Sequence, residues 1–397
     1  MGSETDIQEN KKTDGRSNRF QTGKILALSI GHFIHDVYSS FLSPLLPLLI
    51  DKLSLTLTQA GFLSTMMQLP ALLNPYIGVM ADRISVRYFV ILAPAMTAVP
   101  MSLIGVAPSY GVLLLLLFIT GISVSIFHVP SPVMIAQLSA ARKGRGMSFY
   151  MTGGELARTI GPLVAVAGVS LLGLEGFYPV MVFVLISSGW LYLKLRDVPV
   201  NDVHTKRKRN LTALQTWRKL RYILWPLTAI LVSRGFMHAS MTAFLPTYIN
   251  QETGNLWLAG IALTLFEVAG VAGVLTAGSM SDLFGRRKTL LVSLIGAPIC
   301  LFVFVLTGGW FRIAALLVTG FTLLSTTPVM LALVQEHGRQ APAAANGLFM
   351  MISFIARSAV VVVVGFIADR IGLQAAYLIS AAMGLIGIPF IFLLPKK

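Results

Sequence analysis

The stretch Gly78-Val79-Met80-Ala81-Asp82-Arg83-Ile84-Ser85-Val86-Arg87 joins two long apolar segments through a short charged turn. Its Gly-x-x-x-Asp spacing returns at Gly278-Ser279-Met280-Ser281-Asp282, at an offset of 200 residues. Three further pairs recur at similar offsets: Pro132-Val133-Met134 with Pro328-Val329-Met330, His35 with His238, and Ala157-Arg158 with Ala356-Arg357. Motifs that repeat in the same order at a near-constant distance predict two copies of one structural unit.

The composition is that of a membrane protein. Of 397 residues, 55% are hydrophobic and only 12% are charged, whereas soluble domains are about 25% charged. The 31 Lys and Arg residues outnumber 16 acidic ones, but they stand in short stretches between apolar runs, so we expect no nucleic-acid partner. The single cysteine, Cys300, lies in an apolar run and excludes a disulfide framework or a cysteine-based zinc site.

Twelve apolar stretches are each long enough to cross a ~30 Å hydrocarbon core as a helix of about 20 residues. They cover 25–50, 59–80, 89–107, 111–138, 147–172, 177–195, 222–250, 256–280, 289–307, 312–335, 346–367 and 374–394. We therefore predict an all-α polytopic membrane protein with twelve transmembrane helices in two pseudo-symmetric six-helix bundles. The predicted divisions are a disordered cytoplasmic tail (1–22), a first bundle (23–196), a basic cytoplasmic linker (197–221) and a second bundle (222–397).

The positions of Lys and Arg predict the orientation, because cytoplasmic loops retain these residues. They concentrate in the tail, in every second loop and in the linker, whereas the alternate loops hold only Lys52, Arg312 and Arg370. We therefore expect a multi-pass protein of the cell (inner, cytoplasmic) membrane with both termini in the cytoplasm. The basic linker has a second interpretation, which is contact with lipid headgroups.

From about Gly23 onward the chain resembles the major facilitator superfamily. The stretch 78–87 is similar to that family's Gly-x-x-x-Asp-Arg-x-Gly-Arg signature, with Ser85 at the second glycine, and 278–288 carries a partial copy. A narrower similarity, to the fosmidomycin-resistance type of drug:proton antiporter, rests on Gly31-His32 with Asp36, Pro44 with Pro47, Phe127-His128 and Gly161-Pro162. Two departures concern drug export: no arginine precedes Thr120-Gly121 in the fourth span, and the exporter motif of the fifth span is incomplete near Arg158. The resemblance implies transport between two bundles, with the site at their interface.

Titratable side chains in the first span are candidates for proton coupling. Such groups cost roughly 2.5–3.5 kcal/mol each within a membrane, so they need a partner or water. His32, His35 and Asp36 lie on one stripe of a helix because they are three and four residues apart. We expect Asp36 and His35 to carry protons and His32 to contact substrate. The alternative is an aspartate that only hydrogen-bonds a neighbouring helix.

Arginines occupy matching positions in the fifth and eleventh spans, at Arg158 and Arg357. Glu155 precedes Arg158 by three residues and can pair with it, either as a proton-coupling group or as a purely structural ion pair. Arg357 has no acid within one helical turn. Two arginines from opposite halves would suit a carboxylate, phosphate or phosphonate through charge-assisted hydrogen bonds, so both are candidate substrate ligands.

Four more side chains complete the candidate chamber. Arg234 and His238 lie four apart in the seventh span and are candidate substrate ligands, unless Arg234 reaches out to the cytoplasmic surface. Glu267 in the eighth span is a candidate for proton coupling or a partner of Arg158. His128 in the fourth span is either a substrate ligand or an ordinary core histidine.

Charged residues at the ends of the second, third, eighth and ninth spans are predicted to gate the transporter. Unpaired backbone groups and helix dipoles at such ends attract side chains of opposite charge. We expect these residues to form a latch between helices that favours the outward-open state and breaks on alternation. They are Asp82, Arg83, Arg87, Asp282, Arg286 and Arg287.

The preferred functional hypothesis is a proton-coupled secondary transporter that exports a small organic anion or amphipathic drug-like molecule by alternating access. We expect a monomer that uses protons and a small-molecule substrate, lies among membrane lipids and needs no cofactor or resident metal. Two alternatives are a flippase for an anionic lipid and a divalent-metal carrier, the latter because His32-x-x-His35-Asp36, with His238 as repeat counterpart, has ligand-like spacing. An enzyme is disfavoured, since neither Gly-x-Ser-x-Gly nor His-Glu-x-x-His occurs.

Overall fold

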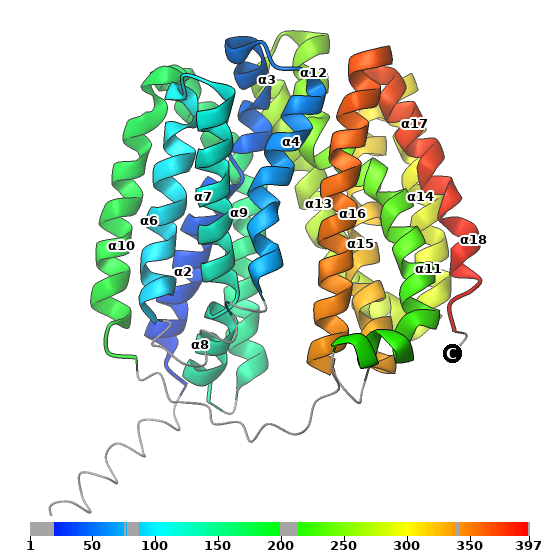
Figure 1. Ribbon diagram of the computed structural model, residues 1–397, viewed down its shortest axis with the longest axis horizontal. Helices are drawn as coiled ribbons and strands as arrows, with labels where there is room; N and C mark the ends of the chain where they lie inside the picture. The colour runs from blue at the N-terminus through cyan, green and yellow to red at the C-terminus, as the bar shows by residue number, and fades with distance from the viewer. Residues whose placement is uncertain are drawn as a thin grey trace, which may run out of the picture.

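The computed structural model describes residues 20–74, 77, 87–140, 142–198, 213–338 and 342–395. This part of the chain is almost entirely helical and contains no strand. Ten of its helical segments are long and apolar enough to cross a membrane. The other two predicted spans are 59–80, whose end lies outside the described residues, and 222–250, which carries Arg234 and His238. All twelve predicted spans thus correspond to helices in two bundles that stand side by side (Figure 1).

The first bundle contains six spans, several of them built from two helices. They are α2 (Thr22–Ser39) with α3 (Leu42–Leu53), α4 (Leu57–Gln68) with η1 (Leu69–Leu73), α6 (Arg87–Leu103) with η2 (Ile104–Val106), α7 (Tyr110–His128) with α8 (Ser131–Leu138), α9 (Lys143–Leu172), and η3 (Glu175–Val180) with α10 (Met181–Leu195). Within the bundle α2 packs against α9, α6 and α10, and α7 packs against α6 and α4.

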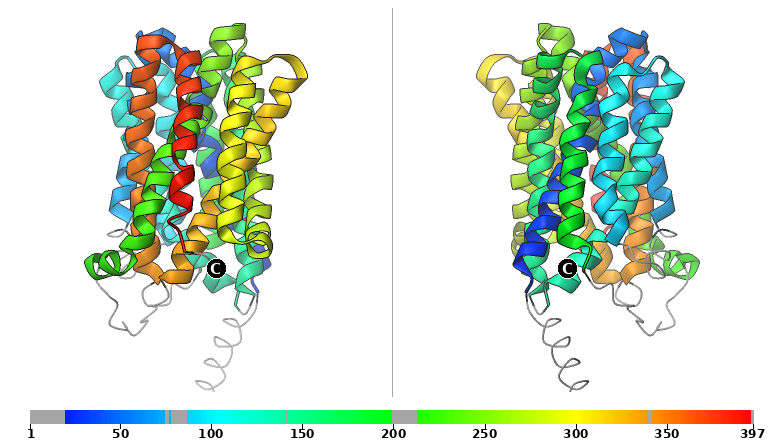
Figure 2. Two further views of the ribbon diagram at one scale, coloured as in Figure 1. Left: turned by 90° about the vertical axis from the view of Figure 1, so that its right-hand side faces the viewer. Right: turned by 90° about the vertical axis from the view of Figure 1, so that its left-hand side faces the viewer.

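The second bundle repeats this order. Its spans are α11 (Ala213–Ala239) with the π-helix η4 (Ser240–Phe244) and α12 (Leu245–Thr253), α13 (Leu256–Phe284), α14 (Arg286–Leu306), α15 (Gly309–His337), α16 (Pro342–Ile371), and α17 (Leu373–Ile386) with α18 (Ile388–Ile391). In the equivalent arrangement, α11 packs against α16 and α17, and α15 packs against α13 and α14. Both perpendicular views show the long helices running in broadly the same direction from one end of the molecule to the other (Figure 2).

Helix α11 begins earlier than the sequence led us to expect. It starts at Ala213, inside the predicted linker 197–221. Near this start, Leu220, Ile223 and Leu224 pack into a hydrophobic core of the second bundle. The basic residues favoured a cytoplasmic linker or contact with lipid headgroups, but apolar positions three and four apart give that stretch a buried helical face. The predicted tail, apart from Phe20 to Thr22, lies outside the described residues, as do linker residues 199–212.

Prolines and polar caps explain several helix breaks. The first span breaks at Ser40 and Phe41, just before Pro44, and the fourth breaks at Val129 and Pro130, because proline lacks the N–H that continues a helix. The hydroxyl of Thr56 accepts from the Gln59 amide, and together with the Gln59 side chain it completes a capping box at the start of α4.

Small residues let the helices approach closely inside each bundle, and large apolar residues face outward. A Cβ on Gly273 would lie 2.2 Å from the carbonyl oxygen of Phe321, and one on Gly121 would lie 2.2 Å from that of Met67. Such contacts are usual between membrane helices. Conversely, Leu171 is 84% exposed although it ends an apolar helix. An exposed apolar surface of this kind is suited to lipid.

The two bundles touch mainly at one end. We call the end where Phe20 and Pro395 lie the terminal side, and the opposite end the distal side (Figure 1). On the distal side, α4 packs against α16, α3 against α12, and α9 against α13. A Cβ on Gly365 would lie 2.3 Å from the Leu57 carbonyl oxygen, and the Ser43 hydroxyl donates to the Thr242 carbonyl at 2.7 Å. Towards the terminal side the bundles diverge, as Figure 1 shows.

Candidate functional site

A cavity of about 760 Å³ lies between the two bundles. Its walls come from α2, α3, α4, α7 and α9 of the first bundle and from α11, α13, α15 and α16 of the second. Six of the residues predicted to carry the chemistry line it: Asp36, His128, Arg158, His238, Glu267 and Arg357. His32, His35 and Arg234 lie behind this wall, each less than one-tenth exposed. We call this cavity the chamber.

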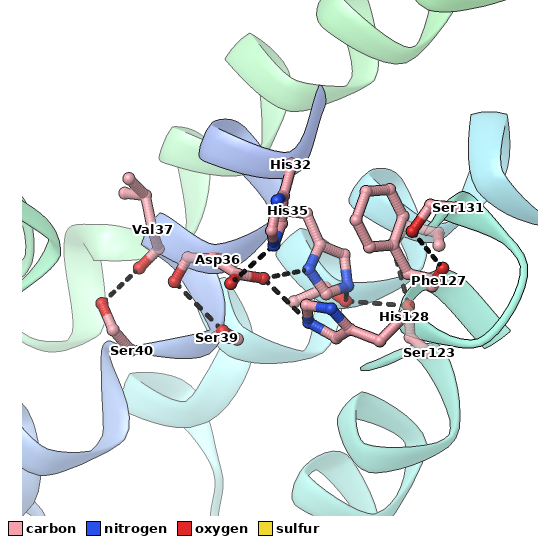
Figure 3. Close-up of polar contacts among 12 residues, drawn as sticks. His32, His35, Asp36, Val37, Ser39, Ser40, Ser123, Phe127, His128 and Ser131 are labelled. Carbon is pink, nitrogen blue, oxygen red and sulfur yellow. Dashed lines mark hydrogen bonds and ion pairs between the residues drawn. The ribbon is translucent and has the colours of Figure 1, made fainter. Parts of the chain in front are cut away.

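Asp36 is surrounded by three imidazole rings. His35 Nδ1 lies 2.8 Å from Asp36 Oδ1, and His128 Nε2 lies 3.1 Å from the same oxygen. His32 Nε2 lies 3.1 Å from Oδ2. Figure 3 shows the three rings converging on the carboxylate, two from α2 and one from the end of α7. The sequence predicted the stripe on α2, but it placed His128 only in the chamber and not beside Asp36.

The far side of His35 is held by a chain of hydroxyl groups. His35 Nε2 lies 3.0 Å from the Thr97 hydroxyl oxygen, and Thr97 donates to the Ser123 hydroxyl at 2.8 Å. Ser123 in turn donates to the backbone carbonyl of Ala93 at 2.8 Å. Helices α6 and α7 thereby orient His35, a role for Thr97 that nothing in the sequence signalled because it stands alone in an apolar span.

The ring of His32 is held by α9. Its Nδ1 lies 2.8 Å from the backbone carbonyl oxygen of Tyr150, and the ring stacks on the Tyr150 ring with centroids 4.0 Å apart. A Cβ on Gly154 would lie 2.5 Å from His32 Cε1 and 2.7 Å from Nε2. The absence of a side chain at Gly154 therefore provides the space that the imidazole occupies.

Arg158 and Glu155 form an ion pair on α9, as their three-residue spacing allows. Glu267 reaches the chamber from α13 in the other bundle, and its charge acts on Arg158, as does that of Asp36. Glu267 Oε2 is buried and has no hydrogen-bond partner within the described chain. The negative charges of Glu155, Glu267 and Asp36 therefore all act on the charge of one arginine, Arg158.

Two arginines of the second bundle have no acidic partner in the part of the chain that the structure describes. Arg357 on α16 makes one long hydrogen bond, from Nε to the Ser353 carbonyl at 3.4 Å, and its guanidinium lies 4.9 Å from the ring centroid of Phe354. Arg234 on α11 is only 5% exposed, and its Nε is buried without a partner. The charges of the two arginines act on each other.

The unpaired cations therefore differ from the pair that the repeat suggested. The sequence favoured Arg158 and Arg357 on opposite halves, whereas in the structure Arg158 is offset by acids and the uncompensated charges are those of Arg234 and Arg357. Both of these arginines belong to the second bundle. His238, four residues after Arg234, contacts the Thr242 hydroxyl through Nδ1 at 3.3 Å and completes this side of the chamber.

The structure describes four of the six predicted gating residues, and these four lie on the terminal side. Asp82 and Arg83 fall outside the described residues. Arg286 pairs with Asp282 at 2.6 Å and with Glu336 of α15 at 2.9 Å. Arg287 donates from Nε to the Ile391 carbonyl at 3.1 Å, and Arg87 donates to the Val198 carbonyl at 3.1 Å.

Each of these contacts joins residues of the same bundle. Sequence reasoning missed Glu336, the partner of Arg286 on α15. It also missed the distal contact in which Asp369 of α16 accepts from the backbone amides of Leu57 and Thr58 at 2.6 and 2.8 Å. Both partners are distant in sequence, so no local spacing could have signalled them.

One group of described residues brings three possible metal-ligating side chains together. Ligand atoms of His32, Asp36 and His128 lie within 4.8 Å of one another. His238, which the repeat suggested as a further ligand, is instead on α11 beside Thr242. The arrangement thus differs from the ligand set that the sequence suggested.

Comparison with known proteins agrees with this architecture. The family model described as Major Facilitator Superfamily matches residues 28–258 and 254–397. The fosmidomycin resistance protein of Escherichia coli is 26% identical over 380 residues, which are 94% of this chain and 93% of that protein. The multidrug resistance protein MdtG of Salmonella paratyphi C is 25% identical over 283 residues, covering 67% of this chain and 68% of the relative.

Among solved structures, a bacterial homologue of the human lysosomal transporter Spinster, in an inward-facing and occupied conformation, superposes with a TM-score of 0.79. The match has 15% identity and covers 94% of this chain and 97% of that one, so it supports the fold. The family match spans nearly the whole sequence, with both halves included. The chain therefore belongs to the Major Facilitator Superfamily, and it is a multi-pass membrane transporter rather than an enzyme.

Proposed function

We propose that this transporter carries a small organic anion through the chamber, by efflux coupled to protons. The observation that carries the proposal is that Arg357 lines the chamber and Arg234 lies buried behind its wall, both with no acidic partner among the described residues. A cation inside a membrane protein is costly unless something neutralises it. An anionic substrate would supply the missing charge each time it bound.

The chemistry of arginine narrows the substrate class. Guanidinium groups bind carboxylates, phosphates and phosphonates through paired N–H donors, whereas two neighbouring arginines repel an organic cation. The rest of the wall offers apolar contact from Phe354, Met350 and Leu324. An anion with an organic body suits this combination better than an inorganic ion does.

The relatives support an export function. One is named for resistance to fosmidomycin and another for multidrug resistance. On this basis we propose outward movement of a toxic or surplus anion, with the terminal side in the cytoplasm and the protein in the inner membrane. The excess of Lys and Arg in the loops of the terminal side supports that orientation.

The arrangement of the bundles suits alternating access from the cytoplasm. Contacts between the bundles lie mainly on the distal side, and they reach the middle of α16, where the Thr65 hydroxyl donates to the Ser358 carbonyl at 2.8 Å. With the terminal side in the cytoplasm, this state would be inward-facing, ready to accept substrate. Rocking of one bundle against the other would break these contacts and open the chamber outward.

Proton coupling is proposed on the acidic side of the chamber. Glu267 is the strongest candidate, because one of its oxygens is buried without a partner and because it faces Arg158 across the bundle interface. Glu155 shares that arginine. A carboxyl group there that gains or loses a proton would change how firmly Arg158 joins the bundles.

Ligand binding to purified protein tests the anion proposal. We expect fosmidomycin, as a phosphonate probe, to raise the melting temperature, and tetraphenylphosphonium, as an organic cation, to leave it unchanged. Arg357→Ala should abolish the shift and Arg357→Lys should weaken it, because lysine keeps the charge but loses paired donors. Arg196→Ala, which removes an exposed arginine beside Asp197, is the matched control.

The same melting-temperature measurements distinguish an anion transporter from a cation transporter and from a lipid flippase. Stabilisation by the cation alone, or a full phosphonate response in Arg357→Ala, would overturn the anion proposal. Stabilisation by phosphatidylglycerol with no response to any soluble anion would favour a lipid flippase instead, since a lipid headgroup satisfies the same arginines.

A further inference from the structure

The proton positions on His32 are fixed by a group outside the Asp36 cluster. A backbone carbonyl can only accept, so the nitrogen 2.8 Å from the Tyr150 oxygen, Nδ1, carries the proton. In a neutral imidazole the other nitrogen, Nε2, then presents a lone pair. That lone pair points at Asp36 Oδ2, 3.1 Å away. Two hydrogen-bond acceptors only 3.1 Å apart repel each other unless a proton or a metal ion lies between them.

The same reasoning applies to His35. The Ser123 hydroxyl gives its proton to the Ala93 carbonyl, and the Thr97 hydroxyl gives its proton to Ser123. The Thr97 oxygen can therefore only accept from His35, which places the ring proton on Nε2. Nδ1 is left with a lone pair 2.8 Å from Asp36 Oδ1. The hydroxyl chain thus aims a second lone pair at the carboxylate.

His128 completes the convergence from α7. Its Nε2 lies 3.1 Å from Asp36 Oδ1, and its Nδ1 has no hydrogen-bond partner within the part of the chain that the structure describes. Nothing therefore prevents His128 from keeping its proton on Nδ1 and offering the Nε2 lone pair. Imidazole nitrogens and a carboxylate then converge with their electron pairs on one small region.

We propose that His32, Asp36 and His128 bind one divalent first-row transition metal ion. The ligands would be Nε2 of each histidine and the carboxylate, whose atoms lie within 4.8 Å of one another. Neighbouring ligand atoms 3.1 Å apart suit an ion with bonds of about 2.0–2.2 Å. Imidazole with carboxylate is the donor set of Zn²⁺, Co²⁺ and Ni²⁺ sites.

Residues around the proposed ligands make hydrogen bonds that orient them, as in most metal sites. Metal-bound histidines generally donate their other N–H to a carbonyl group, as His32 does to Tyr150. Thr97 in turn holds the ring of His35, which lies beside the carboxylate. These contacts hold the His32 ring in place and restrict the space around the carboxylate.

Charge and access also suit a cation at this place. The ionised Asp36 offsets part of the ion's charge, and Arg158, on which the charge of Asp36 acts, is paired with Glu155. Asp36 and His128 line the chamber, and the His128 side chain is 37% exposed. An ion can therefore enter from the chamber and keep a coordination position open towards it. The site belongs to the first bundle and does not depend on the proposed anion.

Calorimetry on the full-length protein tests the site. After chelator treatment and removal of any histidine tag, titration with ZnCl₂ should show one saturable site per chain. We expect His32→Ala and His128→Ala each to weaken binding at least tenfold, the usual effect of losing a ligand or its support. His337→Ala is the matched control, since His337 lies at the end of α15 and should leave binding unchanged.

Cobalt gives a readout that does not depend on folding yield. Bound Co²⁺ should give visible d–d absorption bands that shift or vanish in His128→Asn, a variant at the edge of the chamber. No saturable binding of Zn²⁺ or Co²⁺ to wild-type protein, or binding that survives both histidine substitutions, would overturn the proposal and leave protons as the charge between these atoms. The phosphonate response of the Arg357 series is measured separately, so either proposal can fail alone.

Discussion

Gly154 shows how one missing side chain can determine the geometry of a site. The His32 ring fills the space next to it, where a Cβ would lie 2.5 Å from the nearest ring atom. The ring also stacks on Tyr150 and donates to its carbonyl, so it has no alternative position close by. At the scale of single residues, the cluster is held by its neighbours on α9 as much as by Asp36.

Gly154→Ala should therefore displace His32 from Asp36. We expect a loss of about 1–3 kcal/mol in the free energy of unfolding, typical of overpacking, together with weaker Zn²⁺ binding. Gly189→Ala is the control, because a Cβ there meets nothing within 4 Å and alanine favours a helix. Thermal melts and calorimetry measure both effects. A Gly154→Ala variant as stable as Gly189→Ala, with full metal affinity, would contradict this account.

At the scale of elements, the distal contact joins the two bundles through a helix end. Asp369, near the end of α16, accepts from the amides of Leu57 and Thr58 and from the Thr58 hydroxyl at 2.5 Å. These amides begin α4, where backbone donors lack partners within the helix and a negative charge is favourable. Asp369 thus caps a helix that belongs to the other bundle, and any opening of the distal side has to break this cap.

Asp369→Asn should shift the transporter towards its distally open state. Losing a charged cap costs about 1 kcal/mol, or roughly a fivefold change in a two-state equilibrium. Spin labels on the distal ends of α4 and α16 would report the change as a larger population at long distances. Thr56→Ala is the matched control, because it removes the cap that α4 receives from its own bundle. Equal distance distributions in wild type and Asp369→Asn would exclude this role.

The helices were easier to predict from sequence than the contacts between side chains of different helices. Long apolar runs between charged turns fixed the twelve spans, and repeated motifs fixed the two halves. The three-residue spacing of Glu155 and Arg158 predicted their pairing because both lie on one helix. By contrast, His128 meets Asp36 from 92 residues away. Contacts of this kind depend on how each helix is rotated about its axis and packed against its neighbours. A local sequence pattern does not specify either.

At the scale of the whole molecule, the chamber separates two kinds of charge. Glu155 pairs with Arg158, and the charges of Glu267 and Asp36 also act on it, whereas Arg234 and Arg357 of the second bundle have no acidic partner among the described residues. Glu267 is the one of these acids that belongs to the second bundle. We propose that rocking of the bundles changes the distance between Glu267 and Arg158 and thereby couples the protonation of this carboxyl to the conformation.

Glu267→Gln should uncouple transport from the proton gradient, because the amide keeps the size of the side chain but cannot take up or release a proton. In proteoliposomes we expect transport of the phosphonate driven by an imposed pH gradient to fall at least tenfold. Exchange of labelled for unlabelled substrate, which needs no net proton movement, should continue. Glu252→Gln makes the same change in a residue that pairs with Arg312 on the distal side, and should stay coupled. If Glu267→Gln responds to the pH gradient as the wild type does, this carboxyl carries no coupling proton, and the effect of its charge on Arg158 is purely structural.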